Sequence, residues 1–422
     1  MSRTLRGTVN LPGSKSESNR ALMIAAYGGF PLEVDGLSDA HDTVLLKTLL
    51  GQVEASTLLR GASATKQSTC RRISNFRHTC GLLRCARNDV VVDCQDAGTV
   101  ARFLMTYLAG LPGTWTLTGT QRLCERPMAP LINALRQLGA SVTSLRGASA
   151  TKQPEGSSTE GRKSTLAQIV GHPIKGGAVT LDTSQSSQFA SSLLMAAPTW
   201  ERGLQLTLTG EPVSMPYLEM TLKMMEHFGV QVARTGNTVT VQHQAYQPCQ
   251  FAVSADWSAA SYWYEMMALS DGGDLLLKGL KPDSLQGDAV VAEWFKPFGV
   301  ITSFEPDGAR LTKVPADPHD LVFDFTHAPD LFPAVCATCA ALGVDAVFKG
   351  TATLSTKESD RLNALKAELS HLGENRVFRT YGDHRIAMAL AALWPKFGPI
   401  QVDNPSVVNK SYPNFWNELV RY

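Results

Sequence analysis

The sequence carries almost no net charge and no long apolar run. Its 39 Lys and Arg residues nearly balance its 38 Asp and Glu residues, so the formal net charge is +1 at pH 7. This balance gives no global case for binding nucleic acid or a membrane surface, and any anion site must come from local clusters of basic side chains. The N-terminus shows no signal-peptide hydrophobic region, and no apolar run is long enough to span a bilayer. We therefore expect a cytoplasmic protein with neither a membrane nor a nucleic-acid partner.

Cysteine spacing that would suit a metal is also missing. Eight cysteines are scattered over 422 residues, and Cys70, Cys80, Cys85 and Cys94 form no CxxC pair. Zinc binding by these four is a weak alternative, and reduced thiols are the expected state. We expect neither a metal nor a cofactor. With 44% hydrophobic residues, the chain is long enough for two or more globular domains.

Residues 58–88 lack any acidic residue, although they contain seven Arg and Lys residues. The nonapeptide LRGASATKQ occurs there at residues 59–67 and recurs unchanged at residues 145–153. One perfect repeat in an otherwise non-repetitive chain does not indicate a solenoid. We predict two surface insertions, at about 58–88 and 145–165, because lengthening a loop costs little closure entropy. Nucleic-acid binding by the basic run is the alternative, but Phe76 is its only aromatic residue.

A helix that ends in Leu-Gly or Phe-Gly, followed by a short strand, recurs along the rest of the chain. Glycine is typical just past a helix C-terminus, and helix–strand alternation favours α/β units. We expect Thr99 to cap one helix, and Pro127 and Pro216 to lie in the first turns of two others. The expected helix ends are Leu50-Gly51, Leu138-Gly139, Phe228-Gly229, Phe298-Gly299 and Leu372-Gly373.

Residues 11–20, LPGSKSESNR, place Ser14, Lys15, Ser16 and Arg20 around the start of an apolar helix. Hydroxyl groups, cations and free N–H groups at a helix N-terminus make an anion site. The nearest general motif is the phosphate-binding P-loop, but its first glycine is missing here. An ordinary capped helix with a solvated lysine is the plain alternative for this segment alone.

Eight further segments combine polar or charged side chains with a helix start. Each alone could be a helix cap or a solvated helix face. Together they favour a site for small, multiply anionic ligands, because phosphates and carboxylates are bound by arginine forks, lysine charges and helix N-termini. The segments are DAGTVAR (96–102), QRLCERP (121–127), SQSSQF (184–189), VSMPY (213–217), HAPD (327–330), KESDR (357–361), YGDHR (381–385) and NKSYP (409–413).

These segments occur in the same order as in the 5-enolpyruvylshikimate-3-phosphate synthase family, which the chain resembles throughout apart from the two insertions. The resemblance implies an α/β protein with the two-domain enolpyruvyl transferase fold. Each domain would contain three βαβαββ units, arranged as an inside-out α/β barrel. One domain would span residues 15–251 and the other residues 1–14 plus 252–422, with a hinge near 12–15 and 250–253.

The reaction that the resemblance implies is transfer of the enolpyruvyl group of phosphoenolpyruvate to the 5-hydroxyl group of shikimate 3-phosphate, with release of phosphate. This step belongs to the shikimate pathway, which leads to chorismate and the aromatic amino acids. Both substrates carry a phosphate and a carboxylate, which explains a cation-rich site in a chain of net charge near zero. No cofactor or metal is implied, and the enzyme would be a monomer.

The resemblance also implies the roles of individual residues. Asp330 would be the base for the 5-hydroxyl group, and Glu358 would protonate the methylene carbon, assisted by Lys15 or Lys410. Shikimate 3-phosphate would be held by Lys15, Ser16, Arg20, Ser186, Ser187, Gln188, Tyr217, Asp330 and Lys357. Phosphoenolpyruvate would be held by Lys15, Gly98, Arg126, Gln188, Arg361, Arg385 and Lys410. One departure is Asp96, which stands where many family members have asparagine.

Three rival functions are weighed against this interpretation. The sister enolpyruvyl transferase acting on UDP-N-acetylglucosamine typically carries a PGGC-type run before an Arg-Pro pair, whereas Cys124 lies two residues before Arg126 without those glycines. A non-catalytic anion-binding relative would not need Asp330, Glu358 and Lys15 together. A phosphoryl-transfer enzyme is disfavoured by the missing P-loop glycine and by the lack of a clear acid pair for a metal.

Overall fold

The computed structural model describes residues 4–64, 89–144, 163–211, 213–374 and 377–422. Most of the two predicted insertions lies outside these residues, so their nature stays a prediction. Where their edges are described, a helix continues to Ala64 and a strand begins at Ser164. Each predicted insertion therefore overlaps a described element at one edge, α2 in the first case and β6 in the second.

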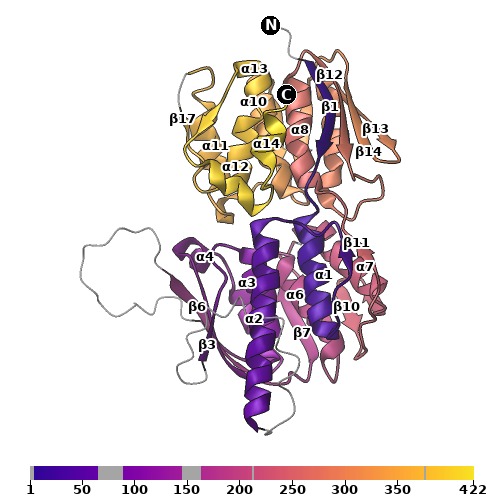
Figure 1. The fold of residues 1–422 in the computed structure, drawn as a ribbon, viewed down its shortest axis with the longest axis vertical. Coiled ribbons are helices and arrows are strands. Elements are labelled where there is room, and N and C mark those ends of the chain that lie inside the picture. The colour runs from indigo at the N-terminus through magenta and orange to yellow at the C-terminus, as the bar shows by residue number, and fades with distance from the viewer. Residues whose placement is uncertain (1–3, 65–88, 145–162, 212, 375–376) are drawn as a thin grey trace, which may run out of the picture.

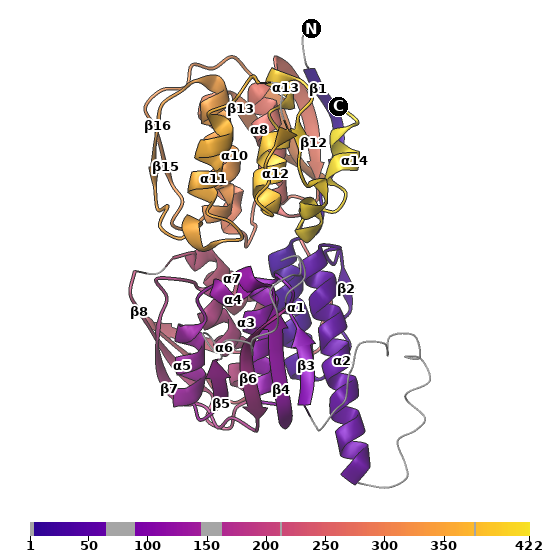
Figure 2. The same cartoon turned by 90° about the vertical axis from the view of Figure 1, so that its left-hand side faces the viewer.

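The chain packs around two separate hydrophobic cores, which define two lobes stacked along the long axis of the molecule (Figures 1 and 2). The core of the first lobe contains buried residues between Ala21 and Tyr246. The core of the second lobe contains Leu5 and Val9 together with buried residues between Ala255 and Phe415. The N-terminal strand thus lies in the same lobe as the C-terminal third of the chain.

The first lobe contains two four-stranded sheets with the same topology. In each, two parallel strands are extended by two antiparallel strands, so that the last two strands of the unit pair with one another. The first unit consists of β3 (Asp89–Asp93), α3 (Gly98–Ala109), β4 (Gly113–Gly119), α4 (Gln121–Glu125), α5 (Ala129–Gln137), β5 (Ser141–Ser144) and β6 (Ser164–Gly171). The second consists of β7 (Gly177–Asp182), α6 (Gln188–Ala196), η1 (Ala197–Thr199), β8 (Leu204–Thr209), α7 (Met215–His227), β9 (Val232–Thr235) and β10 (Thr238–Val241).

The second lobe repeats this βαβαββ pattern once, with its first strand supplied by the N-terminus. This unit consists of β1 (Thr4–Asn10), α8 (Trp257–Leu269), β12 (Gly272–Lys278), η2 (Gly287–Val290), α9 (Val291–Trp294), η3 (Lys296–Phe298), β13 (Val300–Glu305) and β14 (Gly308–Lys313).

The remaining repeats are each represented, among the described residues, by a parallel strand pair with its helices: β11–β2, β15–β16 and β17–β18. In the first lobe these are α1 (Lys15–Gly28), β2 (Val34–Asp35), α2 (His41–Ala64) and β11 (Phe251–Ala252). In the second they are β15 (Leu321–Asp324), η4 (Pro329–Leu331), α10 (Phe332–Leu342), β16 (Ala346–Lys349), η5 (Leu354–Thr356), α11 (Arg361–Leu369), β17 (Val377–Phe378), α12 (His384–Ala391), α13 (Trp394–Phe397), β18 (Gln401–Val402), η6 (Pro405–Lys410) and α14 (Phe415–Leu419).

Each lobe has helices inside and sheets outside. The central helices α1, α3 and α6 contact one another in the first lobe, and α8, α10 and α12 do so in the second. All residues of α8 and α12 are buried, as a helix surrounded by protein on every side requires. This is the inside-out α/β arrangement that the resemblance implied.

The glycine pattern predicted several helix ends correctly. Gly139, Gly229 and Gly299 follow α5, α7 and η3 with φ of 94°, 84° and 77°, a left-handed conformation that favours glycine. The prediction for Leu50-Gly51 is wrong, because α2 runs through both residues to Ala64. One interior glycine costs a helix only about 1 kcal/mol, which the flanking helix formers can offset.

Two of the predicted helix starts are also wrong. Ala97, rather than Thr99, is the N-cap residue of α3, so Thr99 already lies inside the helix. The proline in the first turn of α5 is Pro130, and Pro127 precedes the helix. Pro216 does lie in the first turn of α7, as predicted.

The chain passes between the lobes twice, and the two passages are bonded to each other. Ser14 N–H donates to Ser254 O (2.8 Å), and Asp256 N–H donates to Pro12 O (2.9 Å). A Cβ atom on Gly13 would lie 2.0 Å from the carbonyl oxygen of Gly36, so only glycine fits there. These passages lie close to the hinge positions that the resemblance implied.

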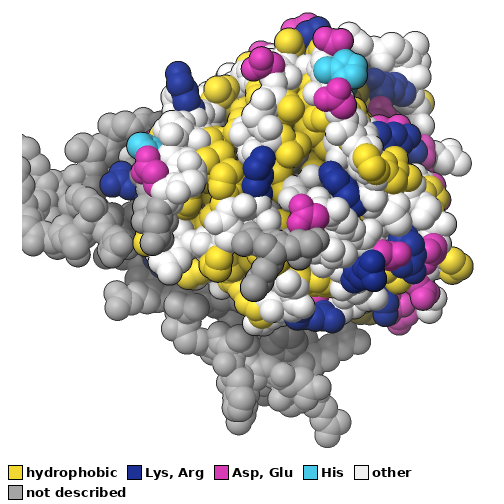
Figure 3. All heavy atoms as spheres, turned by 90° about the horizontal axis from the view of Figure 1, so that it is seen from above, with side chains coloured by type: hydrophobic (Ala, Val, Ile, Leu, Met, Phe, Trp, Pro, Cys, Tyr) yellow, Lys and Arg dark blue, Asp and Glu magenta, His cyan; other side chains and the backbone are white. Residues whose placement is uncertain are grey.

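The distribution of charged side chains on the surface and the polarity of the described helices agree with the nearly equal numbers of basic and acidic residues. On the end face of the second lobe, acidic, basic and apolar side chains lie interspersed (Figure 3). Among the residues that the structure describes, no helix is long and apolar enough to cross a membrane.

Glu265 is an anomaly of the second core. It lies in α8 with no exposed surface, and neither of its carboxyl oxygens has a hydrogen-bond partner among the described residues. Burial raises the pKa of Glu265 well above its ordinary value of 4.5. The folded protein therefore binds a proton that the unfolded chain releases as pH rises above about 4.5.

We expect Glu265→Gln to remove this pH-dependent loss of stability. The stability advantage of the variant over the parent protein should grow with pH above about 4.5, by up to about 1.4 kcal/mol per pH unit. Urea unfolding at pH 5, 6 and 7 measures it, with Glu293→Gln as the control because the side chain of Glu293 is 66% exposed. A stability difference that does not change with pH would show that Glu265 titrates normally.

Candidate active site

Six central helices direct their N-termini at one cavity between the lobes. The cavity is lined by residues at or near the starts of α1, α3 and α6 from the first lobe and of α8, α10 and α12 from the second. The free N–H groups and the dipoles of these helices make the cavity attractive to anions from both sides. Of the predicted site residues, those that line it are Lys15, Ser16, Gly98, Arg126, Ser186, Ser187, Gln188, Tyr217, Asp330, Lys357, Glu358, Arg361 and Arg385.

Lys15 lies at the point where the lobes meet. Ser14 caps α1 by accepting a hydrogen bond from Glu17 N–H (3.4 Å), so Lys15 is the first residue of the helix. Its Nζ lies 3.3 Å from Asp42 Oδ2 in the first lobe, and its backbone N–H donates to Asp256 Oδ2 of the second lobe (3.3 Å). The anion site predicted from residues 11–20 is thus a helix start, as expected.

Arg20 does not line the cavity. The side chain is buried, and its guanidinium donates to Thr221 Oγ1 (2.7 Å), Ser16 O (2.9 Å) and Tyr217 O (3.1 Å). Burial lowers the pKa of Arg20 to about 10, which still leaves it charged at neutral pH. Its contacts in this structure are with protein atoms, and through them it holds two residues that line the cavity, Ser16 and Tyr217.

A network of buried opposite charges forms the wall of the second lobe. Arg361 donates to Asp383 (Nε–Oδ2, 2.8 Å), Asp330 (Nη1–Oδ1, 2.9 Å) and Glu358 (Nη2–Oε2, 3.0 Å). Arg385 Nη2 donates to Asp330 Oδ2 at 2.8 Å. Arg361 thus joins two of the acidic residues expected in the site, Asp330 and Glu358, through one guanidinium group.

Asp330 also contacts the first lobe and Lys357. Its Oδ1 lies 3.6 Å from Lys357 Nζ, and its Oδ2 accepts from the Tyr217 hydroxyl at 3.4 Å. Burial by itself would raise the pKa of Asp330, but Arg385, Lys357 and Arg361 outweigh it and hold that pKa well below its ordinary value. The carboxylate is therefore ionised and able to accept a proton.

Glu358 is surrounded by cations of both lobes. Its Oε1 lies 3.4 Å from Arg126 Nη1 and 3.9 Å from Lys410 Nζ. Burial would raise the pKa of Glu358, but Arg126, Lys410 and Arg361 outweigh it and hold that pKa well below its ordinary value. In this arrangement Glu358 carries no proton to donate.

Gly98 makes room for arginine side chains. A Cβ atom there would lie 2.6 Å from Arg126 Nη1 and 3.1 Å from Arg102 Nη1. Arg102 in turn donates to Gln188 Oε1 at 2.8 Å. A side chain at position 98 would displace a guanidinium that faces the cavity.

The sequence analysis did not select several residues that line the cavity. Asp256 caps α8 and Asp42 follows the first residue of α2, so helix-start chemistry could have indicated both. Arg102 lies one turn into α3, in a segment that had been noted. The selection also omitted Thr99, Gln185, Ser214, Ser258, Thr353, Thr356 and His384, all of which line the cavity.

Comparison with known proteins decides the family. The family model described as EPSP synthase (3-phosphoshikimate 1-carboxyvinyltransferase) matches residues 1–419. A 3-phosphoshikimate 1-carboxyvinyltransferase of Bacteroides fragilis is 38% identical, with 98% of this chain and 95% of the relative covered. One of Methanosphaerula palustris is 34% identical, with 97% and 95% covered.

The chain belongs to the EPSP synthase family.

A solved structure agrees with this at the level of the fold. EPSP synthase from Acinetobacter baumannii matches with a TM-score of 0.68 at 20% identity, covering 100% of this chain and 96% of that one. The two-domain enolpyruvyl transferase fold that the sequence implied is thereby confirmed. At this identity the likeness concerns the fold alone.

The family membership also confirms the expected activity. As an EPSP synthase, the protein is a 3-phosphoshikimate 1-carboxyvinyltransferase, which uses phosphoenolpyruvate and shikimate 3-phosphate in the shikimate pathway of aromatic amino acid biosynthesis. The comparisons do not favour the alternative transferase acting on UDP-N-acetylglucosamine.

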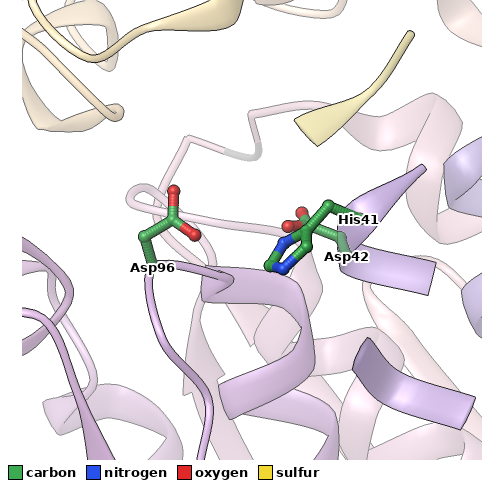
Figure 4. A group of neighbouring side chains, drawn as sticks. All are labelled: His41, Asp42 and Asp96. Atoms are coloured by element: carbon green, nitrogen blue, oxygen red, sulfur yellow. The ribbon is translucent and has the colours of Figure 1, made fainter. Parts of the chain in front are cut away.

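Asp96 gives this EPSP synthase a contact between the lobes with Lys410, although neither residue is among those that line the cavity. Lys410 Nζ, on η6 of the second lobe, donates to the carboxylate of Asp96 and to Asp96 O (3.0 Å) in the first lobe. Asp96 also lies beside His41 and Asp42, and one potential ligand atom from each of the three lies within 4.8 Å of the others (Figure 4). Lys410 and Lys15 supply positive charge to these acids, so the acids are partners of the two lysines.

We expect Asp96→Asn to lower the KM for phosphoenolpyruvate. The carboxylate competes with an anionic substrate for Lys410, and this partly exposed ion pair is worth on the order of 1 kcal/mol, or about fivefold in KM. Steady-state kinetics at low ionic strength measure it. Asp274→Asn is the matched control, because it removes the exposed Asp274–Arg310 pair far from the cavity. An unchanged or raised KM would show that Asp96 does not compete with substrate.

Proposed function

We propose that enolpyruvyl transfer takes place in the cavity between the lobes. The proposal is carried by the convergence there of six helix N-termini and of lysine and arginine side chains from both lobes around the ionised carboxylate of Asp330. Two substrates that each bear a phosphate and a carboxylate match this distribution of charge.

Shikimate 3-phosphate would bind mainly to the first lobe. The polar side chains that start α1 and α6 line the cavity and would meet its phosphate, and Tyr217 would face its ring. Lys357 and Asp330 would reach it from the second lobe. The proposed contacts are Lys15, Ser16, Ser186, Ser187, Gln188, Tyr217, Lys357 and Asp330, while Arg20 acts indirectly by holding Ser16 and Tyr217.

Phosphoenolpyruvate would bind beside it, between cations of the two lobes. Arg126 and Arg361 already bind the carboxylate of Glu358, and Lys410 lies near it, so an anion of similar size fits between these cations. The proposed contacts are Lys15, Gly98, Arg126, Gln188, Arg361, Arg385 and Lys410.

The proton transfers follow from the charges. Asp330, being ionised, would take the proton of the 5-hydroxyl group as that oxygen attacks phosphoenolpyruvate. Glu358 would protonate the methylene carbon, assisted by Lys15 or Lys410. An anion bound to Arg126 and Lys410 would offset the positive charge that keeps Glu358 ionised. Substrate binding would therefore raise the pKa of Glu358 and favour its protonation. Fixed cations would stabilise the tetrahedral ketal until it loses phosphate together with a proton of the new methyl group, which restores the double bond of the enolpyruvyl product.

We further propose that the lobes are the two domains expected from the sequence, residues 15–251 and residues 1–14 plus 252–422, and that the paired passages between them act as a hinge. We also propose a cytoplasmic monomer, because the proposed contacts of both substrates belong to one chain and the described cysteines, among them Cys94 and Cys339, are free thiols.

The activity itself is tested by release of inorganic phosphate. We expect release from phosphoenolpyruvate in the presence of shikimate 3-phosphate and none with UDP-N-acetylglucosamine. A colorimetric phosphate assay on the purified, folded protein measures both. Absence of release with shikimate 3-phosphate would contradict the proposed reaction.

The role of Asp330 is tested by Asp330→Asn. The amide keeps the shape of the side chain but cannot accept the proton, so we expect kcat to fall by about 10²- to 10⁴-fold. Binding of shikimate 3-phosphate, measured by calorimetry, should persist. Asp345→Asn is the control at an exposed position of the same lobe. Turnover close to that of the parent protein would remove Asp330 as the base.

A further inference from the structure

Arg122 connects the lobes outside the cavity. It lies in α4, a five-residue helix that is fixed in the first lobe by its Thr120 cap and by the buried side chains of Leu123 and Cys124. Its own side chain is 42% exposed and is not part of the cavity lining. A surface arginine with this exposure would ordinarily have no role in catalysis.

The hydrogen bonds of Arg122 nevertheless run to the second lobe, more than 230 residues away in the sequence. Its Nη2 donates to Ser355 O (3.1 Å) and Lys357 O (2.9 Å), and its Nε donates to Glu358 O (3.2 Å). One guanidinium thus satisfies three backbone carbonyl groups, which its planar arrangement of donors allows and a lysine ammonium does not match.

Ser355 lies in η5, and the other two carbonyl groups belong to the irregular segment between η5 and α11, which carries Lys357 and Glu358. From this segment Lys357 reaches Asp330 (3.6 Å) and Glu358 reaches Arg126 (3.4 Å). The first lobe therefore binds Glu358 twice, at its backbone through Arg122 and at its carboxylate through Arg126. Because Arg122 and its partners lie in different lobes, the three bonds exist only while the lobes are together.

We propose that Arg122 is a positioning residue of the EPSP synthase reaction, which docks the first lobe on the backbone of residues 355–358 and thereby sets Lys357 and Glu358 for catalysis. This inference rests on the roles proposed above for those two residues. Arg122 touches no substrate. It acts on the geometry of the side chains that do.

Arg122→Ala should lower kcat by about 10- to 100-fold, the range that a displacement of about 1 Å in a catalytic group produces. The Kd of shikimate 3-phosphate measured alone should change less than about twofold, because that substrate binds mainly to the first lobe. Arg122→Lys should restore only part of kcat, since an ammonium cannot span three carbonyl groups.

Arg234→Ala is the matched control. Arg234 is a first-lobe arginine with a side chain 35% exposed, which bonds the carboxylate of Glu219 and a backbone carbonyl, Gly236 O (3.3 Å). Arg122 likewise pairs with a carboxylate of its own lobe, Glu125 (Nη1–Oε2, 3.6 Å), in addition to its backbone carbonyl partners. Among the described residues, the partners of Arg234 lie within its own lobe, so its loss should leave kcat unchanged. Equal kcat values for the two alanine variants would overturn the proposal. So would a loss of activity in Arg122→Ala that is accompanied by a lower melting temperature and lost binding of shikimate 3-phosphate, because that result indicates a structural role.

A double variant separates this inference from the proposed function. If Arg122 acts by positioning Glu358, then Arg122→Ala should reduce the kcat of Glu358→Gln much less than it reduces that of the parent protein. If instead the two substitutions lower kcat independently, so that their fold-losses multiply in the double variant, the positioning role of Arg122 is overturned and the proposed function stays intact. Parent-like activity of Glu358→Gln alone would instead contradict the catalytic role of Glu358, whatever Arg122 does.

Discussion

The constraint on which this structure depends is that six buried helices begin at one cavity. Their free N–H groups cannot be satisfied by the surrounding sheets, so polar caps, ligands or both must meet them. The βαβαββ repeat produces this arrangement, since it places a central helix of each unit inside a lobe with its N-terminus toward the other lobe. An anion-binding cavity is therefore a consequence of the fold, before any basic side chain is considered.

The buried charges of the cavity then depend on one another. Arg361, with a side chain 1% exposed, is tolerable only because Asp383, Asp330 and Glu358 surround it. The protein's own carboxylates also act as counter-ions for cations that substrates would otherwise bind. Asp42 pairs with Lys15, Asp96 with Lys410, and Glu358 with Arg126. A chain of net charge near zero can thus hold a strongly anion-attracting site.

The errors of the sequence-based predictions share a physical cause. Glycine follows the ends of α5 and α7 because the backbone adopts a left-handed conformation there. Gly51 is also a glycine after a leucine, but it lies inside the long helix α2, which continues through it. Arg20 lies in the motif that the sequence selected, and in this structure its guanidinium donates to protein atoms, Thr221 Oγ1 and Tyr217 O. Local chemistry predicts where a cation lies along the chain, but not whether its hydrogen bonds remain available.

The sequence by itself determined the repeated α/β units, the helix starts that carry the polar side chains, and the family, because these depend on local patterns and their order. Only the tertiary structure decided the partners. Arg122 and Arg126 lie four residues apart, yet one meets the backbone of Glu358 and the other its carboxylate, 232 or more residues away in the sequence. Such pairings depend on how the two lobes pack against each other, and no local sequence pattern predicts a contact between residues so far apart in the chain.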